Sequence, residues 1–469
     1  MEWFVLSDRV GRFPPIILAC LVVVASCAST PAPSTSSGEQ ALPGFDIVSL
    51  DPGDAAEPAL AIGPDGTITI MAGAFEHATW AGFHTKLWAN SNGVTETRGA
   101  FQTFDHPTDR AVPSRDSDVE VNSTGTLHAT TNVRLYDASL EAPPPGAVPA
   151  WAISAIRCPD TASAGFDAND CSLQLIDEAT TEVGGLDRPW ILASGEDVWI
   201  AYHAASVIRV QHSPNDGLTW QMVGSLVPSD DASGRRLDNR QGPLALDPVT
   251  GDLAMIYITI DLLGLAANPG AGSEKVQVAR SADNGATWAS SVVHTGGPDE
   301  RLSNAFASLA IDQVSGVWHA SWSDGQSVFA ARSTDGSAWS QPQAISTAPA
   351  RFALMPWVAA ALDVVDIAYY ATDSLDGTDI SNQWSVFLAQ SHDEGLTYQQ
   401  TIVNPEPHHL GLVCVDGADC PVESRLLLDL FEIAISPATA KSAIACTDST
   451  RGTTGSGDPL PSVVLALER

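Results

Sequence analysis

A short motif that recurs along the chain constrains its fold more than any other feature. The sequence SADNGATW begins at Ser281, and variants of it begin at Ser213 (SPNDGLTW), Ser333 (STDGSAW) and Ser391 (SHDEGLTY). Each copy follows one run of alternating or β-branched residues and precedes another strand-like run. Two such runs joined by a glycine-containing segment indicate a β-hairpin, so we expect each motif to form a hairpin turn.

A second repeat lies out of phase with the first and predicts the rest of each sheet. Each copy has a short apolar strand, a turn and a second strand, with the residue types that favour tight turns at its centre. The copies begin at Pro58, Asp118, Pro189, Pro243, Ala307, Pro356 and Phe431. Two inner strands and one outer hairpin make a four-stranded antiparallel sheet, and a series of such sheets is typical of a β-propeller.

The predicted fold class is therefore all-β, a seven-bladed β-propeller of four-stranded antiparallel sheets. The last repeat has its two inner strands and the segment SVVLALER before the chain ends, so it lacks one strand. We expect residues 45–51 (FDIVSLD) to supply that strand and close the ring, which leaves only short edges exposed. The alternative is a six-bladed ring with the last repeat as an appendage.

The pattern Ser-x-Asp-x-Gly-x-Thr-Trp resembles the Asp box of the bacterial neuraminidase repeat, so the chain resembles the sialidase superfamily of propellers. SADNGATW matches in full, whereas SPNDGLTW has Asn215 at the aspartate position. A short carboxylate can accept backbone N–H groups in such a turn, and glycine takes a positive φ at no steric cost. The resemblance implies a structural role at the outer rim for the box residues, namely Ser213, Asp216, Trp220, Ser281, Asp283, Trp288, Ser333, Asp335, Trp339, Ser391, Asp393 and Tyr398.

In that superfamily three arginines hold the substrate carboxylate, a tyrosine activated by a glutamate attacks the sugar, and an aspartate transfers the proton. The Arg-Ile-Pro signature of sialidases is missing here. The candidates for the acid/base are Asp116 and Asp118, and those for the nucleophile are Tyr369 and Tyr370. None of these four stands in a diagnostic motif.

Arginines precede the inner strand of nearly every repeat and are the candidate ligand-binding residues. One interpretation is a cationic ring at the channel mouth that captures an anionic ligand, because the planar guanidinium suits bidentate contact with a carboxylate. The other is pairing between arginine and neighbouring carboxylates that only fixes loops. The residues are Arg115, Arg188, Arg240, Arg301, Arg351 and Arg425.

Two function classes follow from these observations. The first is a surface module that binds a glycan or another anionic small ligand without turnover. The second is an exo-glycosidase of sialidase type that hydrolyses terminal sialic acid or a related acidic sugar. Fold-level analogy cannot decide between them, because function depends on the site and not on the fold.

The N-terminus predicts export and lipid anchoring. Basic residues, a short apolar run and small residues make residues 1–26 a signal peptide, and the sequence Val-Ala-Ser-Cys ending at Cys27 resembles a bacterial lipobox. Residues 27–44 are a Ser/Pro-rich tether, and residues 45–469 are the propeller. We expect Cys27 to be lipidated and the protein to lie at the outer membrane or cell surface, held to the membrane only through its lipid. The alternative is an ordinary signal cleaved near Ala25 or Ala28.

Composition limits the partners. The chain has 22 Lys+Arg against 56 Asp+Glu, a net charge of −34, which disfavours nucleic acids and anionic membranes. We expect a monomer. In an exported chain the cysteine pairs Cys158–Cys171 and Cys414–Cys420 are predicted disulfides that staple loops. No cofactor or metal is required by any motif, although calcium is possible at the acidic surface.

Overall fold

The computed structural model describes residues 42–469 apart from short internal segments. The segments left out are 52–53, 75–79, 143–149, 160–165, 180–184, 231–234, 261–273, 298–299, 416–419, 422–423 and 454–458. Residues 42–469 form one compact unit. The predicted signal peptide, the lipidation site Cys27 and most of the tether lie outside the described residues.

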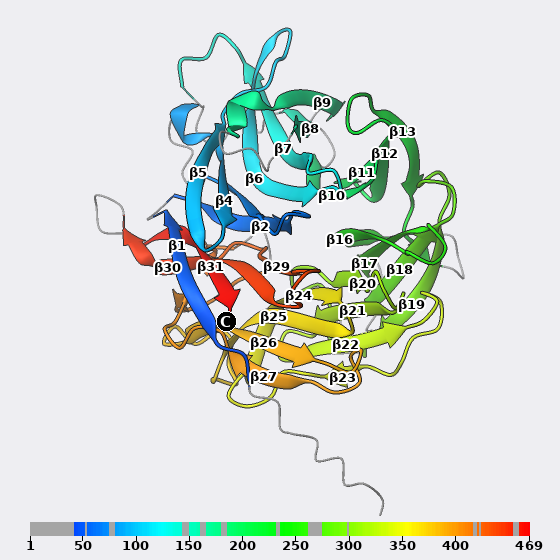
Figure 1. Ribbon diagram of the computed structural model, residues 1–469, viewed down its shortest axis with the longest axis vertical. Coiled ribbons are helices and arrows are strands. Elements are labelled where there is room, and N and C mark those ends of the chain that lie inside the picture. The colour runs from blue at the N-terminus through cyan, green and yellow to red at the C-terminus, as the bar shows by residue number, and fades with distance from the viewer. Residues whose placement is uncertain are drawn as a thin grey trace, which may run out of the picture. The chain divides into compact units, whose positions relative to one another are not determined.

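Six four-stranded antiparallel sheets follow one another along the chain (Figure 1). The first comprises β2 (Ala56–Ile62), β3 (Ile68–Gly73), β4 (Thr85–Ser91) and β5 (Val94–Phe101). The second comprises β6 (Asp109–Val121), β7 (Leu127–Asp137), β8 (Ala150–Cys158) and β9 (Ser172–Ala179). The third comprises β10 (Leu186–Ser194), β11 (Asp197–Ala204), β12 (Val207–Ser213) and β13 (Gln221–Leu226). The fourth comprises β16 (Asp238–Leu246), β17 (Leu253–Ile260), β18 (Lys275–Ser281) and β19 (Ala289–Thr295).

The fifth sheet comprises β20 (Ser308–Ile311), β21 (Trp318–Ser323), β22 (Val328–Ser333) and β23 (Gln343–Ala344). The sixth comprises β24 (Phe352–Ala361), β25 (Val364–Thr372), β26 (Gln383–Ser391) and β27 (Gln399–Ile402), and β28 (His409–Leu410) pairs with β26. Smaller elements are the ribbon β14 (Ser229–Asp230) with β15 (Arg235–Arg236) and the 3-10 helices η1 (Trp80–Gly82) and η2 (Ala168–Asp170). Neither of these described helices is long or apolar enough to span a membrane.

The seventh sheet joins the two ends of the unit. It comprises β29 (Glu432–Ile435), β30 (Ser442–Thr453), β31 (Pro459–Glu468) and β1 (Phe45–Asp51), and β1 pairs antiparallel with β31 so that Phe45 lies opposite Glu468. The innermost strands contact one another in the order β2, β6, β10, β16, β20, β24, β29 and back to β2. The prediction of seven blades closed by residues 45–51 is confirmed, and the six-bladed alternative is wrong.

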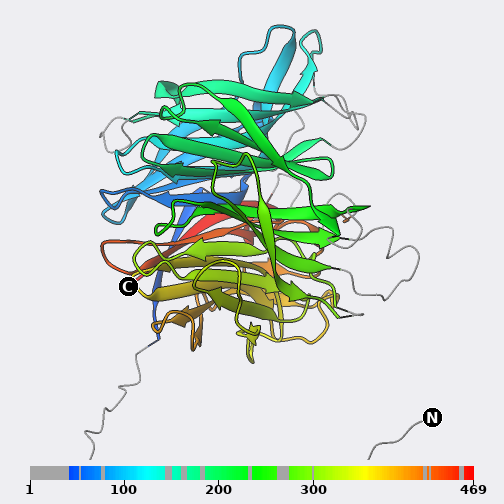
Figure 2. The same cartoon turned by 90° about the vertical axis from the view of Figure 1, so that its right-hand side faces the viewer.

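Neighbouring sheets lie face to face (Figure 2). Side chains that alternate along the strands fill the space between them. In β12, for example, Ile208 and Val210 are buried while Val207 and Arg209 are only half-buried. A period of two sends one set of side chains to one face of the sheet. The apolar core therefore lies between adjacent blades, as where Val210 packs with Leu244 and other residues of the next sheet.

The box motifs lie in the turns between the third and fourth strands of their sheets. At Asp283 the carboxylate accepts Thr287 N (2.8 Å), Thr287 Oγ1 (2.7 Å) and Ser281 Oγ (2.8 Å). These hydrogen bonds, those from Thr287 first, lower the pKa of Asp283. Gly285 has a φ of 93°, and a Cβ there would lie 2.9 Å from Val210 Cγ1 of the preceding blade. A larger side chain at this position would collide with the preceding blade, so the close contact between the turn and that blade requires glycine.

The first box departs from the predicted assignment of Asp216. Asn215 takes the box position, because its Oδ1 accepts Thr219 N at 3.0 Å and Ser213 Oγ at 3.0 Å. Asp216 instead has a φ of 58° and reaches the preceding blade. There its carboxylate pairs with Arg157 (Nε to Oδ2, 3.1 Å) and with His128 (Nε2 to Oδ1, 2.9 Å). Asp216 thus links two blades and does not stabilise its own turn.

Both predicted disulfides are present. Cys158 at the end of β8 is bonded to Cys171, which follows η2. Cys414 is bonded to Cys420 in the segment before β29. Each bridge shortens a loop and so reduces the entropy of the unfolded chain.

Candidate functional site

The innermost strands bulge near their beginnings, at the centre of the ring. Pairing with the second strand shifts register between Ala56 and Ala59 in β2, Pro113 and Ser117 in β6, Asp187 and Trp190 in β10, Gln241 and Leu244 in β16, and Leu354 and Trp357 in β24. A bulge leaves a residue out of the ladder and re-aims its side chain. Positive φ angles recur at or near these positions, at Glu57 (55°), Arg188 (53°), Ala305 (67°), Met355 (55°) and Leu428 (57°). Such strained non-glycine residues often mark functional sites.

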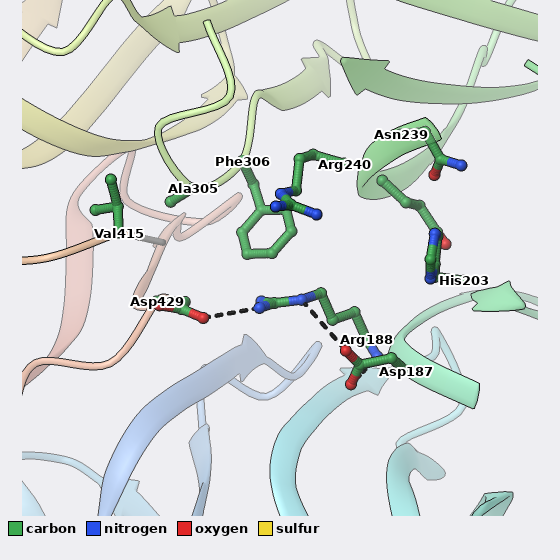
Figure 3. A pocket seen from close by; sticks show the side chains of 10 residues that line it. Asp187, Arg188, His203, Asn239, Arg240, Ala305, Phe306, Val415 and Asp429 are labelled. Atoms are coloured by element: carbon green, nitrogen blue, oxygen red, sulfur yellow. Dashed lines mark hydrogen bonds and ion pairs between the residues drawn. The ribbon is translucent and has the colours of Figure 1, made fainter. Parts of the chain in front are cut away.

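A cavity of about 200 Å³ lies among these bulges (Figure 3). It is formed by the start of β10, the end of β11, the start of β16 and the segments that precede β20 and β29. Its lining residues are Asp187, Arg188, His203, Asn239, Arg240, Gln241, Ala305, Phe306, Val415 and Asp429. These residues come from four repeats, so the cavity exists only in the closed ring.

Arg188 crosses the cavity between two carboxylates. Its Nη2 lies 2.7 Å from Asp429 Oδ2, its Nε lies 3.7 Å from Asp187 Oδ2, and its guanidinium lies 4.4 Å from the ring centre of Phe306. Burial alone would lower the pKa of Arg188, but the surrounding carboxylates raise it above its ordinary value. The side chain therefore remains a cation that is fixed in direction by its partners.

Asp429 is the most strongly held carboxylate of the site. Its Oδ2 also accepts Arg425 Nη2 at 3.0 Å, and its backbone N–H donates to Glu57 Oε1 at 3.0 Å. Burial would raise the pKa of Asp429, but Arg188 and Arg425 lower it below its usual range. Burial raises the pKa of the neighbouring Glu57 to about 8. At neutral pH one carboxyl is therefore ionised while its neighbour is protonated.

A second pair of carboxyls shares one amide. Asn132 Nδ2 donates to Asp116 Oδ2 at 2.7 Å and to Asp187 Oδ1 at 2.9 Å. Burial, followed by the charge of Asp187, raises the pKa of Asp116 to about 6. The negative charge of a neighbouring carboxylate disfavours ionisation of Asp116, in the same direction as burial.

Several polar atoms around the cavity have no hydrogen-bond partner among the described residues. Asn239 and Gln241 are each 1% exposed, and both amide atoms of each are unpaired. Arg188 Nη1 and Asp429 Oδ1 are also buried and unpaired. The side chain of Arg240, half-buried, forms no ion pair within the described part of the chain. Buried polar groups almost always have partners, so this set of donors and acceptors makes the cavity the candidate site.

The structure divides the predicted arginines into two groups. Arg188 and Arg240 line the cavity, Arg425 reaches it through Asp429, and Arg115 lies in the bulge of β6, near Glu57 and Asp116. Arg301 and Arg351 are exposed and do not line the cavity. Arg188 and Arg425 pair with a carboxylate at the centre, as the loop-fixing interpretation expects, and capture of an anionic ligand stays a prediction.

None of the four residues that were candidates for catalysis lines the cavity. Asp118 uses its carboxylate to accept Ile191 N at 2.8 Å and Val119 N at 2.8 Å, which ties β6 to β10. Tyr369 donates to Gln400 Oε1 at 2.7 Å, and Tyr370 donates to Thr447 O at 3.0 Å. Both tyrosines are 0% exposed. Only Asp116 belongs to the charged cluster beside the cavity.

Sequence reasoning missed the residues that contribute most to this site. Asp187, Asn239, Gln241 and Asp429 stand in no motif. A signal did exist, because the bulged residue directly precedes a proline in several repeats, as in Glu57-Pro58, Arg188-Pro189, Gly242-Pro243 and Met355-Pro356. Aligning the repeats on that proline would have marked Asp187, Asn239 and Gln241, but not Asp429, because Leu428 is followed by no proline.

No group of three or more His, Cys, Asp or Glu side chains in the described ranges is arranged to hold a metal ion. The carboxylates of the site are matched by arginines instead, which occupy the positions that a cation would take. Calcium at another part of the acidic surface stays a prediction.

No protein-family model matches the sequence, and no curated protein matches it. Among solved structures, the chain is similar to an α-L-arabinanase of Penicillium chrysogenum, with 13% identity, a TM-score of 0.36, and coverage of 59% of this chain and 92% of that one. It is also similar to the NanB sialidase of Streptococcus pneumoniae (10% identity, TM-score 0.44, 91% and 71%) and to the Trypanosoma rangeli sialidase (12%, 0.44, 91% and 60%). At these identities the similarity concerns the fold alone.

Proposed function

We propose that the central cavity binds the acidic end of a glycan. The observation that carries the proposal is the set of buried, unpaired donors and acceptors on Arg188, Asn239, Gln241 and Asp429. A sugar hydroxyl both donates and accepts a hydrogen bond, so neighbouring hydroxyls can satisfy amide N–H, amide C=O and carboxylate oxygen together. An apolar or purely anionic ligand would leave half of these atoms unpaired.

Arg240 supports an acidic sugar over a neutral one. Its guanidinium lines the cavity and forms no ion pair within the described residues, whereas Arg188 is already held by two carboxylates. A carboxylate of the ligand can take the bidentate position on Arg240. The volume of about 200 Å³ is below the roughly 300–1,000 Å³ of common small-molecule sites, which suits a terminal ring and not an extended chain.

The tyrosine mechanism of the sialidase alternative is not supported. None of the six tyrosines of the chain lines the cavity. The proposal is therefore recognition of an acidic sugar, without a tyrosine nucleophile.

Titration calorimetry of the purified protein tests this function. We expect N-acetylneuraminic acid or glucuronic acid to saturate one site, and glucose to bind at least about tenfold more weakly because it offers Arg240 no charge. Arg240→Gln should remove the preference for the acid, while the matched variant Arg351→Gln, an exposed arginine outside the cavity, should keep it. Equal binding of acidic and neutral sugars, or no binding of either, contradicts the proposal.

The proposal includes display of this site at the cell envelope through a lipid on Cys27. Its support is the lipobox-like sequence and the Ser/Pro-rich tether, which has nothing to bury. Metabolic labelling with a fatty-acid analogue should mark the wild-type chain and not Cys27→Ser. Equal labelling of both chains contradicts the anchor.

A further inference from the structure

We infer that a groove between the first and seventh sheets binds an aromatic side chain on a basic segment of a partner protein. The groove has a volume of about 500 Å³. It lies where β2 ends at Ile62, whereas the central cavity lies near the beginnings of the innermost strands, so the two sites are at opposite ends of those strands. The inference therefore goes beyond the proposed recognition of a sugar and does not depend on it.

Three turns and one strand end form the groove. The turns join β2 to β3, β4 to β5 and β29 to β30, and the strand end is that of β31. Ile62, Ile68 and Leu467 line the groove, are half-buried and pack against the core between the two sheets. The exposed residues of the lining include Asn92 and Thr439, whose side chains can hydrogen-bond to a peptide backbone. The groove thus offers apolar contact and hydrogen-bonding groups together.

At every other interface between neighbouring sheets, an aromatic side chain packs beside the segment that leads into the outermost strand. Trp220 and Trp288 directly precede β13 and β19, and Phe45 is the first residue of β1. Each packs against the core that its sheet forms with the preceding sheet. An aromatic ring suits such a space because it buries roughly 150–250 Å². The six residues are Phe45, Phe166, Trp220, Trp288, Trp339 and Tyr398.

The interface between the seventh and first sheets has no such side chain among the described residues. Asn92 and Gly93 alone join β4 to β5, with φ angles of 54° and 80°, so the hairpin closes directly and has no residue that could fold over the seventh sheet. β5 then begins at Val94, which is 61% exposed. Trp88 belongs to the core of this interface, but it lies within β4, is 1% exposed and does not line the groove. The groove therefore lies where an aromatic side chain packs at the other interfaces.

A second copy of this chain does not offer the missing side chain. The exposed large apolar side chains of the described residues are leucines, isoleucines, valines and one methionine, and none is aromatic. Each described aromatic side chain is at least partly buried in its own sheet or interface. The occupant that fits the groove is therefore a segment of a different protein.

The charges of the groove favour a basic segment. Asp65 accepts Thr67 N and Thr67 Oγ1, both at 2.9 Å. Glu468 accepts Ser442 N at 2.8 Å. These hydrogen bonds fix two carboxylates in the lining, against the single cation Lys441. The whole chain has a net charge of −34, so the field around the groove also attracts lysine or arginine beside the aromatic residue.

Fluorine NMR of a synthetic peptide tests the inference on the purified protein. The probe is the peptide Gly-Lys-Gly-Trp-Gly-Lys-Gly with fluorotryptophan as its aromatic residue. We expect its resonance to shift and broaden saturably, with a Kd below about 1 mM. As competitors, unlabelled peptides with alanine in place of tryptophan, or glutamate in place of both lysines, should be at least about tenfold weaker than the parent peptide.

Two variants of the groove locate the binding. Ala438→Trp and Thr439→Trp replace exposed lining residues, so each should fill the groove with a ring of the chain itself and weaken the peptide by at least about tenfold. Ala138→Trp changes an exposed alanine in the turn after β7, outside the groove, and should keep the wild-type affinity. Melting temperatures near that of wild type establish that all three variants are folded.

The inference is wrong if the wild-type protein does not bind the probe up to about 1 mM, or if both groove variants bind it as tightly as wild type. Equal competition by the alanine peptide would show that the groove does not recognise an aromatic ring, and equal competition by the glutamate peptide would contradict the basic partner. Dimerisation of the wild-type chain that Ala438→Trp abolishes would assign the groove to a second copy instead. Sugar binding measured on the same samples is expected to be unchanged in all variants, so failure of either proposal leaves the other standing.

Discussion

Asn215 and Asp283 occupy the same position in two of the box turns, and they show what that side chain contributes. Each accepts the backbone N–H of the threonine four residues later, at 3.0 Å for Asn215 and 2.8 Å for Asp283. That hydrogen bond needs only one acceptor oxygen, which both asparagine and aspartate supply. The negative charge of Asp283 is therefore not required for the turn to form.

We expect Asp283→Asn to be tolerated and Asp283→Ala to be costly. Asparagine keeps the acceptor, so the free energy of unfolding should fall by less than about 0.5 kcal/mol, whereas alanine leaves Thr287 N unpaired and should cost about 1–2 kcal/mol. Urea unfolding of the two variants beside wild type measures the difference. An asparagine variant as unstable as the alanine variant would show that the charge itself stabilises the turn.

The residues of the central site depend on strain that the rest of the ring must maintain. Arg188 keeps a φ of 53° although a non-glycine residue in that region costs roughly 1–3 kcal/mol. Its ion pair with Asp429, 241 residues away in the sequence, fixes the guanidinium in the cavity. The site is therefore a product of ring closure and not of local sequence.

At the scale of the strands, side chains bridge the innermost strands of adjacent blades. Asp118 on β6 accepts Ile191 N of β10, Glu432 on β29 accepts Leu60 N of β2, and Ser308 on β20 accepts Val358 N of β24. An innermost strand has an unpaired edge, and these contacts satisfy its N–H groups. Asp118 is thus a structural bridge in the position where sequence reasoning expected a catalytic acid.

Asp118→Ala should destabilise the protein without affecting the cavity. The buried Ile191 N–H would lose its acceptor, so the free energy of unfolding should fall by about 1–3 kcal/mol. The affinity for the acidic sugar should stay within about twofold of wild type, because Asp118 does not line the cavity. If the variant remains folded by circular dichroism but no longer binds the sugar, Asp118 contributes to the functional site and the prediction is wrong.

β1 and β31 come from the two ends of the propeller and pair without a turn that connects them, so a cross-link between them should strengthen the ring. Asp46 and Leu467 are directly paired across it, which suits a disulfide in the double variant Asp46→Cys, Leu467→Cys. The closed loop is very long, so the oxidised form should be more stable than the reduced form by about 3–5 kcal/mol. Wild type treated with the same reductant controls for the two native disulfides, and an equal loss in both proteins would mean that the seam does not open in unfolding.

The sequence was sufficient for the fold because the information is repeated. Seven copies of one pattern each predict the same sheet, and the segment FDIVSLD was identified as the closing strand from the incomplete last repeat. The site carries no such redundancy. Asp187 and Asp429 come from different blades and both contact Arg188, and Asn132 joins Asp116 to Asp187 only across a blade interface. Such contacts depend on the angles between blades, which no local pattern encodes.

The whole molecule combines an acidic surface with buried carboxyl groups, and both favour a mildly acidic medium. Burial raises the pKa of Glu57 and Glu120 to about 8 and that of Asp118 and Asp366 to about 7. A carboxyl whose pKa is raised by folding stabilises the folded state while it is protonated, and that contribution is lost as the pH rises through the folded-state pKa. The net charge of −34 adds self-repulsion in the same direction.

Other groups determine how the free energy of unfolding falls at acidic pH. Burial lowers the pKa of His319 and His408 to about 4. Below about pH 6.5 these histidines are therefore protonated more readily in the unfolded state, which lowers the free energy of unfolding as the pH falls. The box aspartates, such as Asp283 and Asp393, have lowered pKa values and lose their contribution only at still lower pH. The four carboxyls with raised pKa values outnumber the two histidines, so stability should still rise as the pH falls below 6 and should be greatest near about pH 4 to 5.

We accordingly expect the melting temperature to fall by roughly 5 °C or more between pH 6 and pH 8, measured by calorimetry at constant ionic strength. Salt at about 0.5 M screens the surface charge but not the buried carboxyls, so most of the fall should persist there. Asp366→Asn removes one buried titrating group that Ser442 and Gln390 contact, and should reduce the pH dependence. A melting temperature that is equal or higher at pH 8 would contradict the prediction, and a fall that salt abolishes would assign the effect to surface charge and not to the buried carboxyls.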